Sequence, residues 1–267
     1  MSPTEIIRWP LEAIWQAVVP QLPGFTCEAL PLVDSTNTEL MRRFKAGQPE
    51  PTLLVAEQQS AGRGRLGRQW QGRRGDSLTF SLGLPLAPVD WSGLSLAVGV
   101  SLAESLDPAS ELRHRIALKW PNDLWLVQKN AERKLAGILV ETAISGGQRY
   151  VVIGVGINVR AIEMPPLGEP AIAPGCLQEL QPGADVASTL ERVLLPLVHA
   201  VQAFEAFGFA PFQARFARRD VLARRQVALS DGTLGQACGV TEAGALLVHT
   251  SAGMKEITSS EVSVRPC

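Results

Sequence analysis

The sequence has few of the features that mark secreted, membrane-spanning or metal-binding proteins. Its four cysteines are scattered, and no two of them form a CxxC pair or another metal-ligating spacing (Cys27, Cys176, Cys238 and Cys267). No apolar run approaches the ~20 residues needed to span a bilayer, and the first residues lack the pattern of a signal peptide. We therefore expect a soluble chain of the reducing cytoplasm with no membrane partner.

An excess of charge of one sign is also missing. The chain has 25 Lys and Arg against 26 Asp and Glu, which gives a formal net charge of −1. This balance argues against a protein that binds nucleic acid over its whole surface, so basic residues must act locally. The sequence contains no internal repeat or low-complexity tract, and 267 residues with 46% hydrophobic content are typical of one large or two small globular domains.

Glycine and arginine alternate, or nearly so, between residues 62 and 70 (GRGRLGRQW). Glycine lets the backbone turn tightly and approach a ligand closely. Arginine presents a planar fork of donors that suits carboxylate and phosphate oxygens. The pattern predicts a loop that closes over an anion such as a nucleotide phosphate. The alternative interpretation is a solvated basic loop.

The same segment satisfies the G-x-G-x-x-G fingerprint of dinucleotide-binding folds through Gly62, Gly64 and Gly67, after a strand-like run at 52–56. That fingerprint must open directly into a helix. Here the chain continues as RQWQGRRGD and then enters an alternating strand. The missing helix argues against a dinucleotide site.

Residues 34–37 (DSTN) are predicted to lie at the N-terminus of a helix. Thr36 and Glu39 have the spacing of a capping box, an apolar stripe follows, and Gly47 supplies a stop. Free N–H groups and the helix dipole favour an anion at such an end. Plain helix capping explains the same spacing without any ligand.

Strand-like runs dominate the middle of the chain. The run at 77–84 (SLTFSLGL) has its large apolar residues at every second position, which predicts a half-buried strand. A core helix starting near Ser92 is followed by four more strand-like runs, at 116–120, 123–127, 134–144 and 149–159. Consecutive strands with short links favour an antiparallel or mixed sheet.

The pattern changes again near Arg218. A helical region at 187–207 precedes this point, and several short strands with turn residues between them follow it. Short strands packed into about 50 residues predict a small barrel. We therefore expect two domains, at 1–217 and 218–267.

Four further pieces carry polar residues that a hydrophobic core would not select. These are KWPND at 119–123, Lys134 at the start of an apolar strand, GVGIN at 154–158, and Arg265. Each is weak alone, because KWPND fits a simple turn and Lys134 fits a solvated strand end. The informative feature is that all four occur together with GRGRLGRQW and DSTN in one chain.

Together these motifs resemble the biotin protein ligase family, also called biotin–[acetyl-CoA-carboxylase] ligases. The matching pieces, in the family's order, are DSTN, GRGRLGRQW, KWPND, KLAGILVE (134–141) and GVGIN. The resemblance implies an α+β fold. Its catalytic domain is a class II synthetase-like mixed sheet flanked by helices, related to lipoate ligases, and a small SH3-like β-barrel follows. Many bacterial members carry an N-terminal DNA-binding domain. Because the motifs begin at Asp34, we expect the form without it and no DNA partner.

The resemblance also implies the reaction. ATP, with Mg²⁺, activates biotin as biotinyl-5′-AMP, and the biotinyl group passes to a lysine of the biotin carboxyl carrier protein of acetyl-CoA carboxylase. A lipoate or octanoate ligase and a non-catalytic biotin sensor are the alternatives. An exposed sheet edge leaves a homodimer and a monomer equally open.

Site residues follow from the resemblance by position. The biotin contacts are Ser35, Thr36, Asn37, Gln59, Gly62, Arg63, Gly64, Arg65, Lys134 and Gly154. The ATP and adenylate contacts are Arg65, Arg68, Trp70, Lys119, Asn122, Asp123, Lys134, Asn158 and Arg265. The catalytic group is Lys134, Arg65, Asp123 and Lys119, and Gly156 allows close backbone approach.

Within that set, Lys134 is expected to bridge the biotin carboxylate and the α-phosphate, and Arg65 to retain the adenylate. We expect the loop at 63–71 to be mobile without ligand, with its arginines lacking partners until anions arrive. Leu66 stands where some members have another basic residue, so this loop is less charged.

Overall fold

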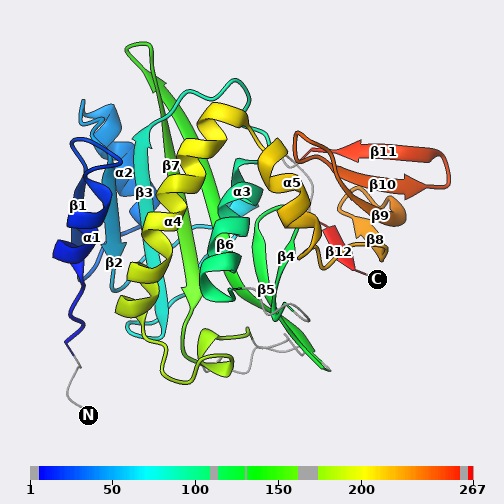
Figure 1. Cartoon of the computed structure of the whole chain (residues 1–267), viewed down its shortest axis with the longest axis horizontal. Helices are drawn as coiled ribbons and strands as arrows, with labels where there is room; N and C mark the ends of the chain where they lie inside the picture. Colours follow the sequence, from blue (N-terminus) through cyan, green and yellow to red (C-terminus); the bar gives the residue numbers. More distant parts are fainter. Residues whose placement is uncertain (1–5, 109–113, 130, 162–173, 259–263, 267) are drawn as a thin grey trace.

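A seven-stranded mixed sheet forms the body of the molecule, and a five-stranded sheet lies beside it near the C-terminus (Figure 1). The computed structural model describes residues 6–108, 114–129, 131–161, 174–258 and 264–266, the last three for their backbone alone. The strands of the large sheet are β1 (Thr26–Leu30), β2 (Thr52–Ala56), β3 (Ser77–Pro85), β4 (Ile116–Lys119), β5 (Asp123–Gln128), β6 (Ala131–Ser145) and β7 (Gln148–Asn158).

The order of the large sheet is β1-β2-β3-β7-β6-β5-β4. Only the β1–β2 pair is parallel among its ladders, and all the other pairs are antiparallel within the described residues. The prediction of a mixed sheet is therefore confirmed. Long antiparallel ladders on both sides of β7 make that strand the centre of the sheet.

Helices cover both faces of this sheet. The helices are α1 (Leu11–Val18), α2 (Thr36–Lys45), α3 (Leu94–Leu106), α4 (Val186–Phe207) and α5 (Ala210–Ala217), with short 3₁₀ turns at Arg65–Gly67 and Leu177–Glu179. Helices α3 and α4 pack on each other and on the face that carries the main core, in front of the sheet in Figure 1. Helix α2 covers the opposite face, where Leu40 and Phe44 contact Leu54, Tyr150 and Val152.

The position of α2 corrects one prediction. Strand β3 was expected to be half-buried, but its residues from Ser77 to Leu84 are all buried. The apolar residues on one side face the helices of the main core, and the small polar residues on the other side lie beneath α2 or in the cavity next to it. The polar positions of this alternating strand therefore face a polar site and not solvent.

The start of α2 corrects a second prediction. The capping residue is Ser35, whose Oγ accepts a hydrogen bond from the Thr38 N–H at 3.4 Å, so the capping box of Thr36 and Glu39 is wrong. Glu39 instead pairs with Arg43, at 2.9 Å. Helix α3 begins at Leu94, close to the prediction, whereas α5 was not predicted.

The smaller sheet has the order β11-β10-β9-β8-β12 and is antiparallel throughout its described ladders. Its strands are β8 (Gln226–Leu229), β9 (Leu234–Val240), β10 (Leu246–Thr250), β11 (Gly253–Ile257) and β12 (Val264–Pro266). Its apolar residues join the main core cluster, and the Trp120 indole N–H donates to the Gly244 carbonyl at 3.1 Å. The domain boundary at 217/218 stays a prediction.

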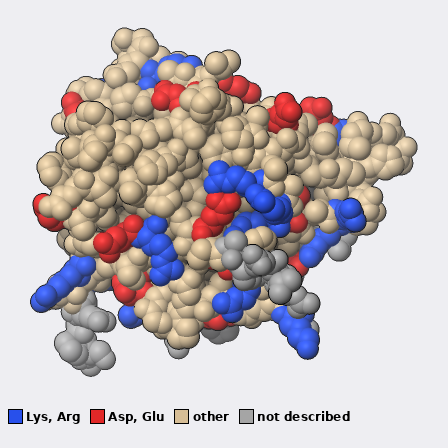
Figure 2. All heavy atoms as spheres, in the orientation of Figure 1, with Lys and Arg blue, Asp and Glu red and all other residues tan. Residues whose placement is uncertain are grey.

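Charge is mixed on the surface seen in Figure 2, where Lys and Arg side chains are interspersed with Asp and Glu among larger uncharged areas. No helix in the described part of the chain has the length and apolar character needed to cross a membrane.

Asp220 lies where the chain passes from the large sheet to the small one. The Val221 N–H donates to the Leu118 carbonyl at 3.0 Å, and Asp220 Oδ1 accepts from the Leu222 N–H at 2.9 Å. Its Oδ2 is buried and has no hydrogen-bond partner among the described residues. Burial raises the pKa of Asp220 from 3.8 to about 6, against the lowering effects of the Leu222 hydrogen bond and Arg225.

This raised pKa predicts a loss of stability with rising pH. Between roughly pH 4 and 6, Asp220 of the folded chain holds a proton that the unfolded chain has lost. The stability that goes with this bound proton is therefore present at low pH and is lost as the pH rises through about 6. Asp220→Asn stays neutral throughout. In urea titrations, we expect the free energy of unfolding of the variant minus that of the parent to be about 2 kcal/mol larger at pH 7.5 than at pH 4.5.

Asp90→Asn is the matched control, because Asp90 Oδ1 accepts from the Ser92 N–H at 2.9 Å in the same local geometry at an exposed position. An equal difference between Asp220→Asn and the parent at both pH values would contradict the prediction.

Candidate active site

A cavity of about 150 Å³ opens on the face of the large sheet that carries α2, beside the N-terminus of that helix. It brings together residues that lie far apart in the sequence. The predicted site residues that line it are Ser35, Thr36, Asn37, Gln59, Arg63, Gly64, Arg65, Arg68, Trp70, Lys119, Asn122, Asp123, Lys134, Gly154 and Gly156.

The floor of the cavity is a hollow made by glycines on the central strands. Gly154 pairs with Ser81 and Leu139, and Gly156 pairs with Thr79 and Gly137. A Cβ added at Gly154 would overlap the Asn37 side-chain oxygen, and one added at Gly156 would overlap the Trp70 indole. The Asn37 amide and the Trp70 ring can therefore lie against the sheet only because Gly154 and Gly156 lack a side chain.

One end of the cavity is lined by neutral hydrogen-bonding groups. The side chains of Ser35, Thr36 and Asn37 are buried at the start of α2. The Gln59 side-chain oxygen accepts from the Thr36 N–H at 2.8 Å. The Ser81 hydroxyl lies 2.7 Å from Thr36 Oγ1 and 2.6 Å from Asn37 Oδ1. These groups hold one another in fixed orientations, which suits a ligand with matched donors and acceptors.

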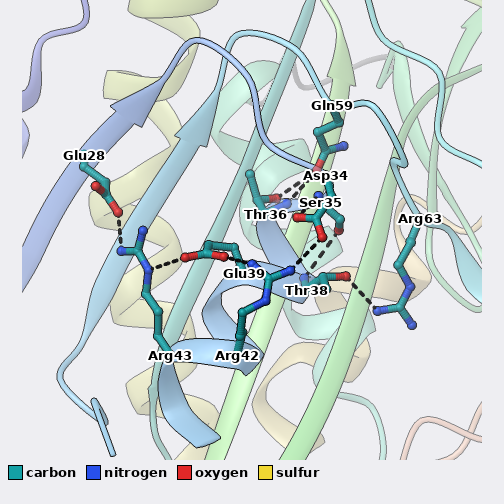
Figure 3. Close-up of polar contacts among 10 residues, drawn as sticks. All are labelled: Glu28, Asp34, Ser35, Thr36, Thr38, Glu39, Arg42, Arg43, Gln59 and Arg63. Atoms are coloured by element: carbon teal, nitrogen blue, oxygen red, sulfur yellow. Dashed lines mark hydrogen bonds and ion pairs between the residues drawn. The ribbon is translucent and has the colours of Figure 1, made fainter. Parts of the chain in front are cut away.

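A ladder of ion pairs fixes the outer side of α2, as Figure 3 shows. Glu28 on β1 pairs with Arg43, Arg43 pairs with Glu39, and Glu39 also pairs with Arg42. Arg42 reaches Asp34 at 2.7 Å. Burial alone would raise the pKa of Asp34, but hydrogen bonds from the Ser35 N–H and Arg42 hold it below its usual range. The ladder ties the DSTN turn to the helix that follows it.

The other end of the cavity is cationic, and a β-bulge supplies its central lysine. Trp125 pairs with Lys134 and Leu124 pairs with Ala136, so Leu135 is an extra residue on β6. Leu135 and Ala136 both enter the main core, whereas Lys134 lines the cavity. Its Nζ lies 2.7 Å from Asp123 Oδ1. The bulge thus directs Lys134 toward the cavity, a common use of bulges near active sites.

The turn at 119–123 and the glycine-arginine loop close this cationic end. Lys119 Nζ lies 5.3 Å from the centroid of the Trp125 ring, a cation–π distance. Arg65 Nη1 donates to Asn122 Oδ1 at 3.3 Å. Burial lowers the pKa of Arg65, with Asp123 opposing and Arg68 adding to this effect. A partly desolvated guanidinium beside a second one favours the arrival of an anion.

The loop itself is a narrow hairpin. The Trp70 N–H donates to the Gly62 carbonyl at 3.0 Å, and the Gly64 N–H donates to the Arg68 carbonyl at 2.7 Å. Arg63 forms an ion pair with Glu141 at 2.8 Å. The expectation that the loop arginines lack partners without ligand is therefore wrong for Arg63. Mobility of the loop stays a prediction.

Three predicted residues do not line the cavity. Gly62 lies at the base of the hairpin and contacts Trp70 through its backbone. The Asn158 amide is buried and donates to the Gly175 carbonyl at 3.3 Å. Arg265 lies on β12 opposite Ala228, but its side chain is outside the described part of the structure. Their roles stay predictions.

Sequence reasoning missed several residues around the cavity. Thr79 and Ser81 occupy the polar side of the alternating run in β3, and that side was assigned no function. Glu141 closes the KLAGILVE motif as an acidic residue after an apolar run, and Gly137 lies within the same motif. The available signals were small polar residues on the alternating strand, a glycine within an apolar run and an acidic residue at the end of that run.

The geometry supports a definite kind of chemistry. A ligand with a neutral polar head and an anionic tail would place its head among the amide and hydroxyl groups and its tail beside Lys134. The described residues contain no group of three or more His, Cys, Asp or Glu side chains that would hold a metal ion. The charged side chains that line the cationic end are Lys119, Lys134, Arg65, Arg68 and Asp123.

Comparison with known proteins gives a consistent result. Residues 29–158 match the biotin/lipoate A/B protein ligase family, and residues 226–265 match the biotin protein ligase C terminal domain. The chain is 35% identical over 259 residues to the bifunctional ligase/repressor BirA of Escherichia coli (strain K12), covering 93% of this chain and 77% of that protein. It is 32% identical over 243 residues to the biotin–[acetyl-CoA-carboxylase] ligase of Paracoccus denitrificans, covering 86% and 96% of the two chains.

Among solved structures, the biotin protein ligase from Aquifex aeolicus in complex with biotin and ATP superposes with a TM-score of 0.74 at 31% identity. The match covers 91% of this chain and 99% of that one. The predicted fold class, a helix-flanked mixed sheet followed by a small C-terminal domain, is thereby confirmed. With matches of this extent to whole proteins, this chain belongs to the biotin protein ligase family.

Proposed function

We propose that this protein is an ATP-dependent biotin–[acetyl-CoA-carboxylase] ligase. The biotin carboxylate attacks the α-phosphorus of ATP, which forms biotinyl-5′-AMP and releases pyrophosphate. A lysine amine of the biotin carboxyl carrier protein then attacks the acyl carbon and displaces AMP. The observation that carries this proposal is the cavity in which a neutral hydrogen-bonding end meets a cationic end around Lys134.

The neutral end suits the ureido ring of biotin. That ring has two N–H donors and one carbonyl acceptor, and Ser35, Thr36 and Asn37 offer hydroxyl and amide groups in a buried setting. A lipoyl group has a dithiolane ring that cannot hydrogen-bond with these side chains. It would leave buried polar groups unpaired, which costs far more than losing an apolar contact. This difference favours biotin over lipoate or octanoate.

In the first step, cations must offset the repulsion between a carboxylate and a polyphosphate. Lys134 is proposed to move from Asp123 to the meeting point of the biotin carboxylate and the α-phosphate. Lys119, Arg65 and Arg68 would hold the remaining phosphate oxygens. Mg²⁺ would enter with ATP, since this ion usually binds through substrate phosphates and one or two carboxylates. Asp123, with Asn122 beside it, is the proposed protein contribution.

In the second step, the mixed anhydride must be kept from water until the carrier lysine arrives. The hairpin at 62–70 is proposed to cover it, with Arg65 holding the adenylate and Trp70 packing against adenine above Gly156. Asn158 and Arg265 are proposed as further nucleotide contacts. The cationic end also argues against a sensor without catalysis, because a sensor needs no charge where the acyl group reacts.

ATP–pyrophosphate exchange tests the proposed reaction. With purified protein and Mg²⁺, we expect labelled pyrophosphate to enter ATP when biotin is added, because adenylation is reversible. Exchange with lipoate or octanoate instead would move the function to the neighbouring ligases. No exchange with any of the three in folded protein would support the sensor.

Lys134→Ala tests the centre of the mechanism. Removing the cation that stabilises the developing charge should slow biotin-dependent exchange by at least about 100-fold. Lys255→Ala is the control, because Lys255 also pairs with an aspartate, Asp231 at 3.3 Å, but on the small sheet. Near-normal exchange in the Lys134 variant would remove this lysine from the reacting centre.

Gly156→Ala tests the hollow in the sheet. A methyl group there overlaps the Trp70 indole, so the ring must shift away from β7. We expect kcat/KM for ATP in the exchange assay to fall roughly tenfold or more, as overpacking would displace a nucleotide contact. Gly183→Ala serves as the control, because a Cβ there meets nothing within 4 Å and φ is not positive. Equal kinetics for the two variants would argue against Trp70 as a nucleotide contact.

A further inference from the structure

Glu141 is a charged residue beside the cavity for which the reaction described above has no use. It lies on β6 opposite Val152, one pleat beyond the row formed by Leu139 and Gly154. Its side chain is mostly covered, with 24% exposed. An acidic group next to a site for two anionic substrates is unfavourable unless it serves another purpose.

Three hydrogen bonds converge on the Glu141 carboxylate. Arg63 Nη2 donates to Oε1 at 2.8 Å, and Arg63 Nη1 donates to Oε2 at 3.2 Å, which makes the pair bidentate. Asn37 Nδ2 donates to Oε2 at 2.9 Å. One carboxylate therefore holds both the glycine-arginine hairpin and an amide at the neutral end of the cavity.

The contact with Asn37 decides how that amide is oriented. Its nitrogen donates to Glu141 and to the Leu139 carbonyl at 3.2 Å, and its oxygen lies 2.6 Å from the Ser81 hydroxyl. A carboxylate can only accept, so the amide nitrogen must face Glu141. The amide oxygen is thereby directed toward Ser81 and the hollow above Gly154.

The contact with Arg63 decides where the hairpin lies. Arg63 Nη1 also donates to Thr38 Oγ1 on α2 at 3.3 Å, the contact drawn in Figure 3. Arg63 is thus attached to β6 through Glu141 and to α2 through Thr38. The next residue, Gly64, lines the cavity with its backbone.

We propose that Glu141 is a positioning residue that pre-orders the biotin site before any ligand binds. It holds the Arg63 end of the hairpin over the cavity and sets the orientation of the Asn37 amide. The conformational entropy of Arg63 and of the Asn37 amide is then already lost in the free protein. Ligand binding is therefore stronger without new contacts to the ligand. This inference rests on the proposed function, because it assigns Glu141 to the biotin end of the same site.

Glu141→Gln isolates the link to the hairpin. Glutamine keeps an oxygen that can accept from Asn37 but loses the charge that pairs with Arg63. We expect KM for biotin in the exchange assay to rise about fivefold, the upper range for a partly exposed ion pair, while kcat changes less than about twofold. Glu141→Ala removes both links and should raise KM further.

The matched control is Glu132→Gln. Glu132 lies on the same strand and forms a bidentate pair with Arg225, at 2.5 and 2.7 Å, and its side chain is 25% exposed. We expect its KM and kcat to equal those of the parent. In ligand-free protein, trypsin should cleave after Arg65 or Arg68 faster in Glu141→Gln than in Glu132→Gln, because only the first change releases the hairpin.

A double-mutant cycle with Arg63→Gln completes the test. If Glu141 acts through Arg63, Glu141→Gln should change KM for biotin by less than about twofold in the Arg63→Gln background. Parent-like KM and trypsin cleavage in Glu141→Gln, with active parent protein, would overturn the inference and leave the proposed function intact. So would a fall in kcat with no change in KM. A parent without biotin-dependent exchange would refute the proposed function, whereas the trypsin comparison would still report on the link to Arg63.

Discussion

The absence of a Cβ at Gly154 and Gly156 is the constraint on which the site depends. Strand β7 is the centre of the large sheet, buried between helices, and any side chain at these positions would fill the space now taken by Asn37 and Trp70. Because β3 and β6 present Thr79, Ser81 and Gly137 in the same rows, the hollow is continuous across three strands. The sheet is thereby both the core of the fold and the floor of the cavity.

Charge is separated along that floor. Neutral amides and hydroxyls gather where α2 begins, and cations gather where β6 bulges toward the turn at 119–123. A substrate with a polar ring and a carboxylate is oriented by this gradient alone. The ion pair of Lys134 with Asp123 and that of Arg63 with Glu141 keep the cations in place without cancelling their donors, since an ammonium has three N–H groups and a guanidinium has five.

Local patterns predicted much of the fold. Strand-like runs located every strand of the large sheet except β1, with period-two alternation as the signal for β3, and the DSTN motif correctly marked a helix N-terminus. The two corrected predictions have different causes. Strand β3 is buried on both faces because α2 covers its polar side, and Ser35 rather than Thr36 caps α2 because the helix starts one residue earlier. Burial on a second face depends on a distant element, so no window of the sequence contains it.

The sequence by itself determined the chemistry available to this protein: two glycines for a hollow, arginines in a hairpin, an amide-rich helix start and a lysine on a strand. It also sufficed to indicate the family, because those motifs occur in one order. Only the tertiary structure decided which groups meet. The bulge at Leu135 directs Lys134 to Asp123, and the pairing of β6 with β7 brings Glu141 within reach of Arg63 and Asn37, 78 and 104 residues away in the chain. Such contacts depend on strand register and side-chain direction, which long-range packing sets and local sequence does not.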